Sequence, residues 1–406
     1  MAEQETPNAV FILTDDQGPW AAGCYGNSEI RTPNIDRLAA TGLRFESFFC
    51  TSPVCSPARA SLMTGAIPSR HGVHDWLREG NMPPDPARYI EGLTCYTDVL
   101  AENGYVCGLS GKWHLGDSMS AQHGLSHWFC LPKGASHYND AEMIRDGKVD
   151  VQPGYLTDVI TDEAIRFIEA HREEPFYLSV HYNAPHAPWT GHPPEIVESY
   201  EDCPFKSCPQ EAAHPWIRPH MRRHLGNRES LKGYFAAVTA MDLNVGWILD
   251  RLSELNLRQK TLVVFTSDNG FSCGHHGFWG KGNGTFPLNM YENSVKVPFI
   301  VSHPGRLSPG RVTEALMSQY DFAPTLLDYL GMPALEDEWL PGRSFVPVWT
   351  GQTDEVREDV VVFDEYGPVR MIRTREWKYV HRYPNGPHEL YNLQEDPDER
   401  ENLAED

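Results

Sequence analysis

A cysteine at the start of an apolar run is the first residue in this sequence with the chemistry of a nucleophile. Cys55 precedes Pro57 and Arg59 within the segment Pro53–Gly65. Pro57 fits the first turn of a helix, because its missing N–H would have no intrahelical partner there. Cys55 is then expected just outside a helix N-terminus, where free N–H groups favour negative charge. The segment is typical of a nucleophile that receives an anionic substrate, and a buried structural cysteine explains it equally well.

Oxygen-donor side chains follow two predicted strands and are candidates for binding a metal ion. Asp15 and Asp16 come directly after the apolar run Ala9–Thr14, and Asp268 and Asn269 follow a similar run. Ligands of open α/β sheets bind at the carboxyl ends of strands. Carboxylate and amide oxygens suit Ca²⁺ or Mg²⁺ better than Zn²⁺. When Asp15 and Asp16 are taken alone, a solvated turn is the favoured interpretation, since Asp is an ordinary turn residue.

Basic side chains gather in the polar loops of an acidic chain. The formal net charge is −22, yet four loops contribute residues that carry or can accept positive charge: Arg59, Lys112, His114, His186 and Lys281. If the backbone after the predicted strand Tyr105–Ser110 is extended, Lys112 and His114 point the same way. Each residue alone would be interpreted as a surface residue. Together with the carboxylates they predict an anion site beside a metal ion.

Strands and helices alternate as far as Gly351, which predicts a large doubly wound α/β domain. Strands are expected at Ala9–Thr14, Leu43–Phe49, Tyr105–Ser110, Phe176–His181, Leu262–Thr266 and Val297–Val301, and helices at Thr32–Gly42, from Pro57 to near Gly65, and at Thr94–Asn103, Asp158–His171 and Gly233–Leu255. The pattern then changes to short strands joined by tight turns, at Val360–Tyr366, Val369–Thr374, Lys378–Tyr383 and Glu389–Leu393. That change predicts a small antiparallel sheet. The expected domains are therefore 1–351 and 352–406.

Size and charge exclude several classes of protein. A chain of 406 residues suits one large domain and a smaller one, and no apolar run reaches the roughly 20 residues of a membrane-spanning helix. The strongly negative charge argues against a nucleic acid or an anionic membrane as partner. The nine cysteines show no disulfide or zinc spacing. Without a recognisable leader, the chain as given is expected in the cytoplasm, or in the periplasm or outside the cell if a leader was removed.

These motifs resemble those of the type I sulfatases, members of the alkaline phosphatase superfamily. The residues from Cys55 to Arg59 match the family signature C-x-P-x-R, and Gly104–His114 resembles the second signature. The other matches are the metal-ligand positions Asp15, Asp16, Asp268 and Asn269, the substrate-side residues His186 and Lys281, and the closing motif Glu389–Pro397. The resemblance covers nearly the whole chain. It implies an alkaline-phosphatase-like mixed sheet, with the catalytic site in the large domain.

The resemblance implies hydrolysis of a sulfate ester to an alcohol and inorganic sulfate. In the family the cysteine is oxidised after translation to formylglycine, so Cys55 would be the precursor of an aldehyde that hydrates to a gem-diol. One hydroxyl would attack sulfur after giving its proton to Asp268, and His114 would take the proton of the other hydroxyl to expel sulfate. His186, with Lys281, would protonate the leaving alcohol oxygen.

The resemblance also implies a metal ion, Ca²⁺ rather than Mg²⁺, whose ligands would be Asp15, Asp16, the converted Cys55, Asp268 and Asn269. Arg59 would stabilise the gem-diol, and Lys112 with Lys281 would offset charge on the sulfuryl oxygens. The implied partners are an enzyme that generates formylglycine and a sulfated small molecule or glycan.

Two other functions are compatible with the same residues. One is a phosphonate monoester or phosphodiester hydrolase on the same fold, and the other is a catalytically inactive protein that binds sulfated glycans. The complete set of metal-binding and cationic residues argues against the inactive protein. A sulfated carbohydrate is the expected substrate, because Trp189, Trp216 and the loop His192–His224 would supply stacking and hydrogen-bonding surfaces. Ordinary packing explains the two tryptophans equally well.

Overall fold

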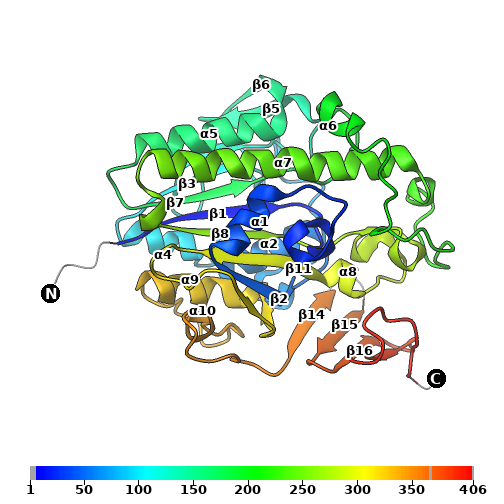
Figure 1. Cartoon of the computed structure of the whole chain (residues 1–406). Helices are drawn as coiled ribbons and strands as arrows, with labels where there is room; N and C mark the ends of the chain where they lie inside the picture. Colours follow the sequence, from blue (N-terminus) through cyan, green and yellow to red (C-terminus); the bar gives the residue numbers. More distant parts are fainter. Residues whose placement is uncertain (1–5, 365–367, 405–406) are drawn as a thin grey trace.

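One large sheet forms the centre of the molecule, within the residues 6–364 and 368–404 that the computed structural model describes (Figure 1). Its strands follow the order β12 (Arg311–Thr313), β2 (Leu43–Phe49), β11 (Lys296–Ser302), β8 (Thr261–Ser267), β1 (Asn8–Thr14), β7 (Phe176–His181), β3 (Val106–Gly111), β4 (Leu125–Cys130), β5 (Asn139–Arg145) and β6 (Lys148–Tyr155). A further short strand, β13 (Met317–Ser318), pairs with β2.

The middle of this sheet is parallel and buried. β1 pairs in parallel with β8 on one side and with β7 on the other, and β7 pairs in parallel with β3. Every residue of β1, β7 and β8 is buried, as their continuous apolar runs predict. Because parallel strands end at the same edge, the loops after these strands meet there. β11 is antiparallel to both β2 and β8, so the sheet is mixed.

Helices cover both faces of the sheet (Figure 1). Alternate residues of β1 point to opposite faces, so Val10 and Ile12 pack in one core and Phe11 and Leu13 in the other. The first core includes α1 (Pro33–Ala40), α5 (Leu156–Ala170) and α7 (Arg228–Glu254), and the second includes α2 (Cys55–Thr64), α4 (Tyr96–Glu102), α9 (Phe322–Leu330) and α10 (Val346–Trp349). This arrangement confirms the predicted doubly wound α/β architecture.

The longest helix begins earlier than its apolar pattern indicates. α7 starts at Arg228 rather than Gly233, because Asn227 accepts a hydrogen bond from the Ser230 N–H over 3.1 Å and caps the helix. The other predicted helices and strands of the large sheet agree with the structure to within a residue or two at each end.

An edge hairpin is the main element that the sequence pattern misses. β4 pairs in parallel with β3, and β5 and β6 follow in antiparallel order. No residue of β6 is buried, and the strand's alternation of Val149 and Val151 with polar residues is short. It also contains Pro153 and Gly154, which argue against a strand. α9, α10, β12 and β13 are likewise absent from the prediction.

A separate antiparallel sheet follows at the C-terminal end of the chain (Figure 1). Its strands are β14 (Val360–Asp364), β15 (Val369–Arg373), β16 (Trp377–Arg382) and β17 (Glu389–Asn392), in that order. The predicted small sheet is confirmed, although Glu365 and Tyr366 of its first predicted strand lie outside the described residues. The division of domains after Gly351 stays a prediction. Within the described residues no helix is long and apolar enough to cross a bilayer.

Candidate active site

Oxygen-donor side chains converge where β1 and β8 end. Asp15 and Asp16 follow β1, and Asp268 and Asn269 follow β8, which lies next to β1 in the sheet. All of these residues are buried, and one carboxylate oxygen from each aspartate lies within 4.8 Å of the others. The tertiary structure therefore gathers the predicted metal ligands of both loops in one place.

Two oxygens of this cluster are suited to bind a cation. Oδ1 of Asp15 and Oδ1 of Asn269 are buried and have no hydrogen-bond partner within the described residues. Asn269 uses its amide nitrogen instead, which donates to Asp16 Oδ1 over 2.7 Å. Buried carboxylates that lie this close are costly unless positive charge offsets them. An oxygen-only donor set with free atoms fits Ca²⁺ or Mg²⁺.

Arg59 lies in the second turn of α2 and contacts three loops, each of which follows a strand of the large sheet. Its Nε and Nη2 donate to Asp268 Oδ2 over 3.0 and 2.9 Å, and Nη2 lies 3.3 Å from Asp15 Oδ2. Nη1 donates to the backbone carbonyl of Lys112 over 3.2 Å. Although burial disfavours its charge, Asp268 and Asp15 raise the pKa of Arg59. Arg59 is thus a charged, buried brace of the site.

Cys55 begins α2 and lies inside its first turn. Val54 is the N-cap residue, so the prediction that Cys55 lies just outside the helix is wrong by one position. Pro57 falls in the first turn as expected, where it removes no helical hydrogen bond. The sulfur therefore lies at the positive end of a helix whose free N–H groups favour an anion.

Lys281 contacts both the cysteine and the carboxylate cluster. Its Nζ lies 2.8 Å from Cys55 Sγ and 2.5 Å from Asp16 Oδ1. Burial opposes its charge, but Asp16 raises the pKa of Lys281 well above its ordinary value. Burial raises the pKa of the Cys55 thiol to about 11, although Lys112 and Lys281 oppose that rise. An unmodified thiol here stays protonated at neutral pH and is a weak nucleophile.

Lys112 and His114 follow β3 but take different directions. Lys112 Nζ forms a fully buried ion pair with Asp15 Oδ2. The backbone is not extended at His114, whose φ is 58°, so the condition under which the two side chains would point the same way is not met. The His114 Nε2 donates to the Leu77 carbonyl over 3.0 Å. Its Nδ1 is buried and has no partner within the described residues. Burial and the charge of Lys112 lower the pKa of His114 well below its ordinary value, so the ring is neutral.

His186 lies at the partly open side of the cluster, in the loop after β7. Its side chain is 23% exposed, and Nε2 lies 3.8 Å from Asp16 Oδ2. A ring nitrogen is within 4.8 Å of Cys55 Sγ and of an Asp15 carboxylate oxygen. Nδ1 donates to the Ala187 carbonyl over 2.9 Å. The ring is therefore held beside the nucleophile position and remains accessible.

Two buried amide side chains that no sequence motif indicates donate hydrogen bonds to backbone carbonyls of the site loops. Gln319 Nε2 donates to the carbonyls of Ser267 and Asp268 over 3.1 and 2.7 Å. Asn289 Nδ2 donates to the Lys281 carbonyl over 3.2 Å. Both residues act on backbone groups of other loops. No local pattern distinguishes them from ordinary polar residues.

The segment His192–His224 is mainly irregular, as expected, with a short helix α6 (Pro194–Glu198) and a 3-10 turn at Arg222–His224. Trp189 next to it is buried, and its indole N–H donates to a backbone carbonyl over 3.1 Å. Trp216 is half-buried, with the Arg382 guanidinium 5.2 Å from its ring centre. The packing interpretation therefore accounts for Trp189, while both interpretations of the half-buried Trp216 stay open.

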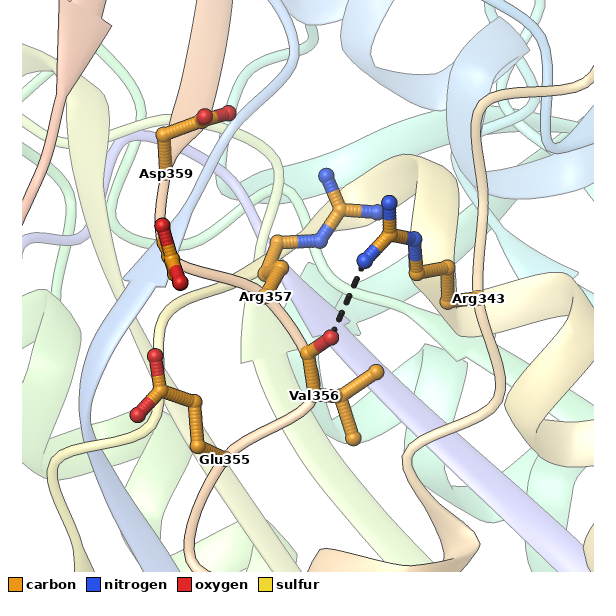
Figure 2. Close-up of a pocket in the computed structure, with 6 residues that line it drawn as sticks. Arg343, Glu355, Val356, Arg357 and Asp359 are labelled. Atoms are coloured by element: carbon orange, nitrogen blue, oxygen red, sulfur yellow. Dashed lines mark hydrogen bonds between the residues drawn. The ribbon is translucent and has the colours of Figure 1, made fainter.

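A separate pocket lies beside the connection to the C-terminal sheet (Figure 2). Its volume is about 360 Å³, and it is lined by Arg343, Glu355, Val356, Arg357, Glu358 and Asp359. Arg343 Nη1 donates to the Val356 carbonyl over 3.0 Å, and Arg357 Nη2 contacts Asp321 Oδ1 at 2.5 Å. None of its lining residues belongs to the predicted site, so this pocket is distinct from the active-site cluster.

Comparison with known proteins identifies family matches along the chain. A family model described as Sulfatase matches residues 7–332. A second, described as N-sulphoglucosamine sulphohydrolase, C-terminal, matches residues 274–406. Together the two matches span the large sheet and the small C-terminal sheet.

Individual relatives agree with the family matches. An N-acetylglucosamine-6-O-sulfatase of Bacteroides thetaiotaomicron is 28% identical and is matched over 99% of this chain and 83% of its own length. A choline-sulfatase of Rhizobium meliloti is 29% identical, over 98% of this chain and 82% of its own. A solved structure in complex with its substrate D-glucosamine-2-N,6-O-disulfate has a TM-score of 0.84 at 26% identity, over 98% of this chain and 93% of its own. This chain therefore belongs to the sulfatase family, whose members hydrolyse sulfuric esters.

Proposed function

We propose that this chain removes sulfate from a sulfated carbohydrate, with Cys55 converted to formylglycine and Ca²⁺ bound by Asp15, Asp16, Asp268 and Asn269. Sulfatases generally use a formylglycine residue and a divalent metal ion. The observation that carries the proposal is the 2.8 Å contact between Cys55 Sγ and Lys281 Nζ beside the carboxylate cluster. The relatives named for glucosamine sulfates support a carbohydrate substrate.

Conversion of Cys55 to formylglycine provides two hydroxyl groups on one carbon, which the thiol does not have. The hydrate of an aldehyde offers one hydroxyl to attack sulfur and a second whose deprotonation releases sulfate. A serine has no second hydroxyl and would retain the sulfate. A divalent cation held by Asp15, Asp16, Asp268 and Asn269 would supply Lewis acidity to the site.

The side chains around position 55 supply charge and proton transfer. Lys112 and Lys281 offset the negative charge that develops on the sulfuryl oxygens. His114 is neutral because burial lowers its pKa, so it can accept the proton whose loss expels sulfate. His186, partly exposed beside Cys55, donates a proton to the leaving alcohol oxygen. Arg59 links α2 to the loops of Asp15 and Asp268 through contacts with both carboxylates.

Mass spectrometry of the peptide that contains residue 55 tests this proposal directly. We expect an aldehyde without sulfur at that position, and release of inorganic sulfate from sulfated monosaccharides by the converted protein. Full sulfatase activity from protein with an unmodified thiol at residue 55 would overturn the mechanism. The Cys55→Ala variant should lose turnover by at least about a thousandfold and keep its cooperative unfolding transition, since the side chain is catalytic rather than core.

A parallel comparison of ester classes separates this function from that of a phosphodiesterase on the same fold. The converted protein should show a higher kcat/KM for 4-nitrophenyl sulfate than for bis(4-nitrophenyl) phosphate. The opposite order would favour the phosphonate monoester or phosphodiester hydrolase. A substrate panel of choline sulfate, aryl sulfates and sulfated mono- and oligosaccharides then ranks the alcohols, and the proposal requires a saccharide at the top of that ranking.

A further inference from the structure

The segment His74–Arg78 lies directly against the active site. The Leu77 N–H donates to Ser56 Oγ over 3.1 Å, and the Leu77 carbonyl accepts from His114 Nε2 over 3.0 Å. These contacts fix the segment between the residue next to Cys55 and a predicted catalytic histidine. No role in the sulfate chemistry has been assigned to its other side chains.

Asp75 brings a carboxylate to this segment. The residue is half-buried, and the charges of Arg78, Lys281 and Arg218 act on its carboxylate. Burial raises the pKa of Asp75, and those cations oppose the rise. Asp75 is absent from the cluster of metal-binding carboxylates. A hydrogen-bond acceptor that the sulfate chemistry does not use thus lies near Lys281.

The irregular segment His192–His224 supplies a cation, Arg218, beside the loop of Lys281. The Arg218 N–H donates to the Gly284 carbonyl over 2.9 Å, and the Gly284 N–H donates to the Lys281 carbonyl over 2.8 Å. An isolated bridge between Ile217 and Thr285 continues the pairing. Arg218 is therefore anchored to the loop that carries Lys281.

An exposed aromatic side chain lies next to Asp75 in the sequence, and another contacts Arg218. Trp76 is 40% exposed, with the Arg78 guanidinium 4.4 Å from its ring centre. Phe286 is 65% exposed, with the Arg218 guanidinium 4.8 Å from its ring centre. Exposed aromatic rings beside hydrogen-bonding groups are suited to the apolar face and the hydroxyls of a sugar.

We propose that Asp75, Trp76 and Arg218 form a saccharide subsite for the sugar that carries the scissile sulfate. Asp75 accepts hydrogen bonds from ring hydroxyls, Trp76 packs on the ring, and Arg218 binds a second anionic group of the sugar, a sulfate or a carboxylate. The inference rests on the proposed function and narrows its substrate to a saccharide with at least two anionic groups. Arg218 is the specificity residue, because a guanidinium binds such groups in bidentate fashion.

Binding measurements on the Cys55→Ala protein test the subsite without turnover. Isothermal titration calorimetry would compare monosulfated and disulfated glucosamine, N-acetylgalactosamine and galactose with 4-nitrophenyl sulfate. We expect a disulfated sugar to bind most tightly. Arg218→Ala should reduce its advantage over the monosulfated sugar by about tenfold, and Arg218→Lys should restore part of it. Asp75→Asn and Trp76→Ala should each weaken every sugar by about tenfold relative to 4-nitrophenyl sulfate.

Matched controls come from exposed residues outside the subsite: Asp85→Asn, Arg222→Ala and Trp339→Ala. Equal losses for sugars and for 4-nitrophenyl sulfate, or no loss at all, would overturn the subsite. So would 4-nitrophenyl sulfate binding as tightly as every disulfated sugar. If the predicted binding pattern appears but the wild-type protein carries no aldehyde and releases no sulfate, the proposed function fails while the subsite stands. Thermal unfolding of each variant confirms that it is folded.

Discussion

At the scale of single residues, the site contains buried ion pairs, each between a cationic side chain and an aspartate. Lys112 contacts Asp15, Lys281 contacts Asp16, and Arg59 contacts Asp268. Removing one partner from such a pair leaves a buried charge uncompensated, which costs about 3–5 kcal/mol. Each carboxylate of the cluster thus has a cationic partner within the protein.

Removal of the metal ion should lower the thermal stability of the protein and its activity together. A ligand that binds only the folded state stabilises it by about 3 kcal/mol at a hundredfold excess over Kd. We expect EDTA to lower the Tm by about 5 °C and CaCl₂ to restore both Tm and sulfate release. Differential scanning fluorimetry measures the shift. The difference in Tm between protein in EDTA and protein in CaCl₂ should be smaller for Asp16→Asn and unchanged for Asp85→Asn. A wild-type Tm that responds to neither reagent would contradict the metal site.

At the scale of elements, glycine at a strand end lets β3 deliver Lys112 into the site. Gly111 has a φ of 115°, a region that side chains other than glycine rarely occupy. A Cβ atom there would lie 1.9 Å from the His181 carbonyl of the neighbouring β7. The close approach of the two strands, and hence the position of Lys112, depends on the missing side chain.

Gly111→Ala should therefore destabilise the protein far more than a glycine substitution that meets open space. We expect a loss of at least about 3 kcal/mol, or no soluble folded protein, because strain and a backbone clash add together. Gly104→Ala is the matched control, since Gly104 also has a positive φ of 89°, but a Cβ atom added there would meet no other part of the protein within 4 Å. Its cost should be about 1 kcal/mol. Urea unfolding compares the two, and equal losses would contradict the close approach.

At the scale of the whole molecule, a buried ion cluster joins the C-terminal sheet to α8 (Glu292–Val295). Lys378 of β16 lies 2.6 Å from Glu399 Oε1 and 3.2 Å from Glu292 Oε1. Glu292 begins α8, and its N–H donates to Glu399 Oε2 over 2.7 Å. Burial raises the pKa of Glu399 to about 7, with Glu292 adding to the rise and Lys378 opposing it. Two carboxylates thus share one buried lysine.

This cluster predicts a pH-dependent stability. Because the pKa of Glu399 is raised from 4.5 to about 7 on folding, its contribution to stability is fully present below pH 4.5 and is lost as the pH rises through 7. Glu399→Gln resembles the protonated acid. The free energy of unfolding of this variant should equal that of the wild type near pH 4.5 and exceed it above pH 7 by up to about 3 kcal/mol. Urea unfolding from pH 4.5 to 8 checks this, with the exposed Glu401→Gln as control; a pH-independent difference would contradict it.

Local patterns in the sequence were sufficient to predict the central strands and the polar loops that follow them. A strand buried on both faces must be apolar at every position, and β1, β7 and β8 are visible for that reason. Asp15 and Asp268 directly follow β1 and β8, and Lys112 directly follows β3, so their convergence at one edge follows from parallel order. The spacing of Cys55, Pro57 and Arg59 alone left a buried structural cysteine as an equal alternative, and the match to the family signature C-x-P-x-R favoured the nucleophile.

The tertiary structure alone decided which distant groups touch. Gln319 holds the loop of Asp268, and Leu77 joins Ser56 to His114, and no periodicity encodes either contact. The turn at His114 was also hidden, because its positive φ depends on surrounding contacts rather than on residue type. Short-range sequence therefore determined the reactive groups and the strands that carry them. Strand order and long-range hydrogen bonds, which depend on the whole chain, decided how those groups face one another.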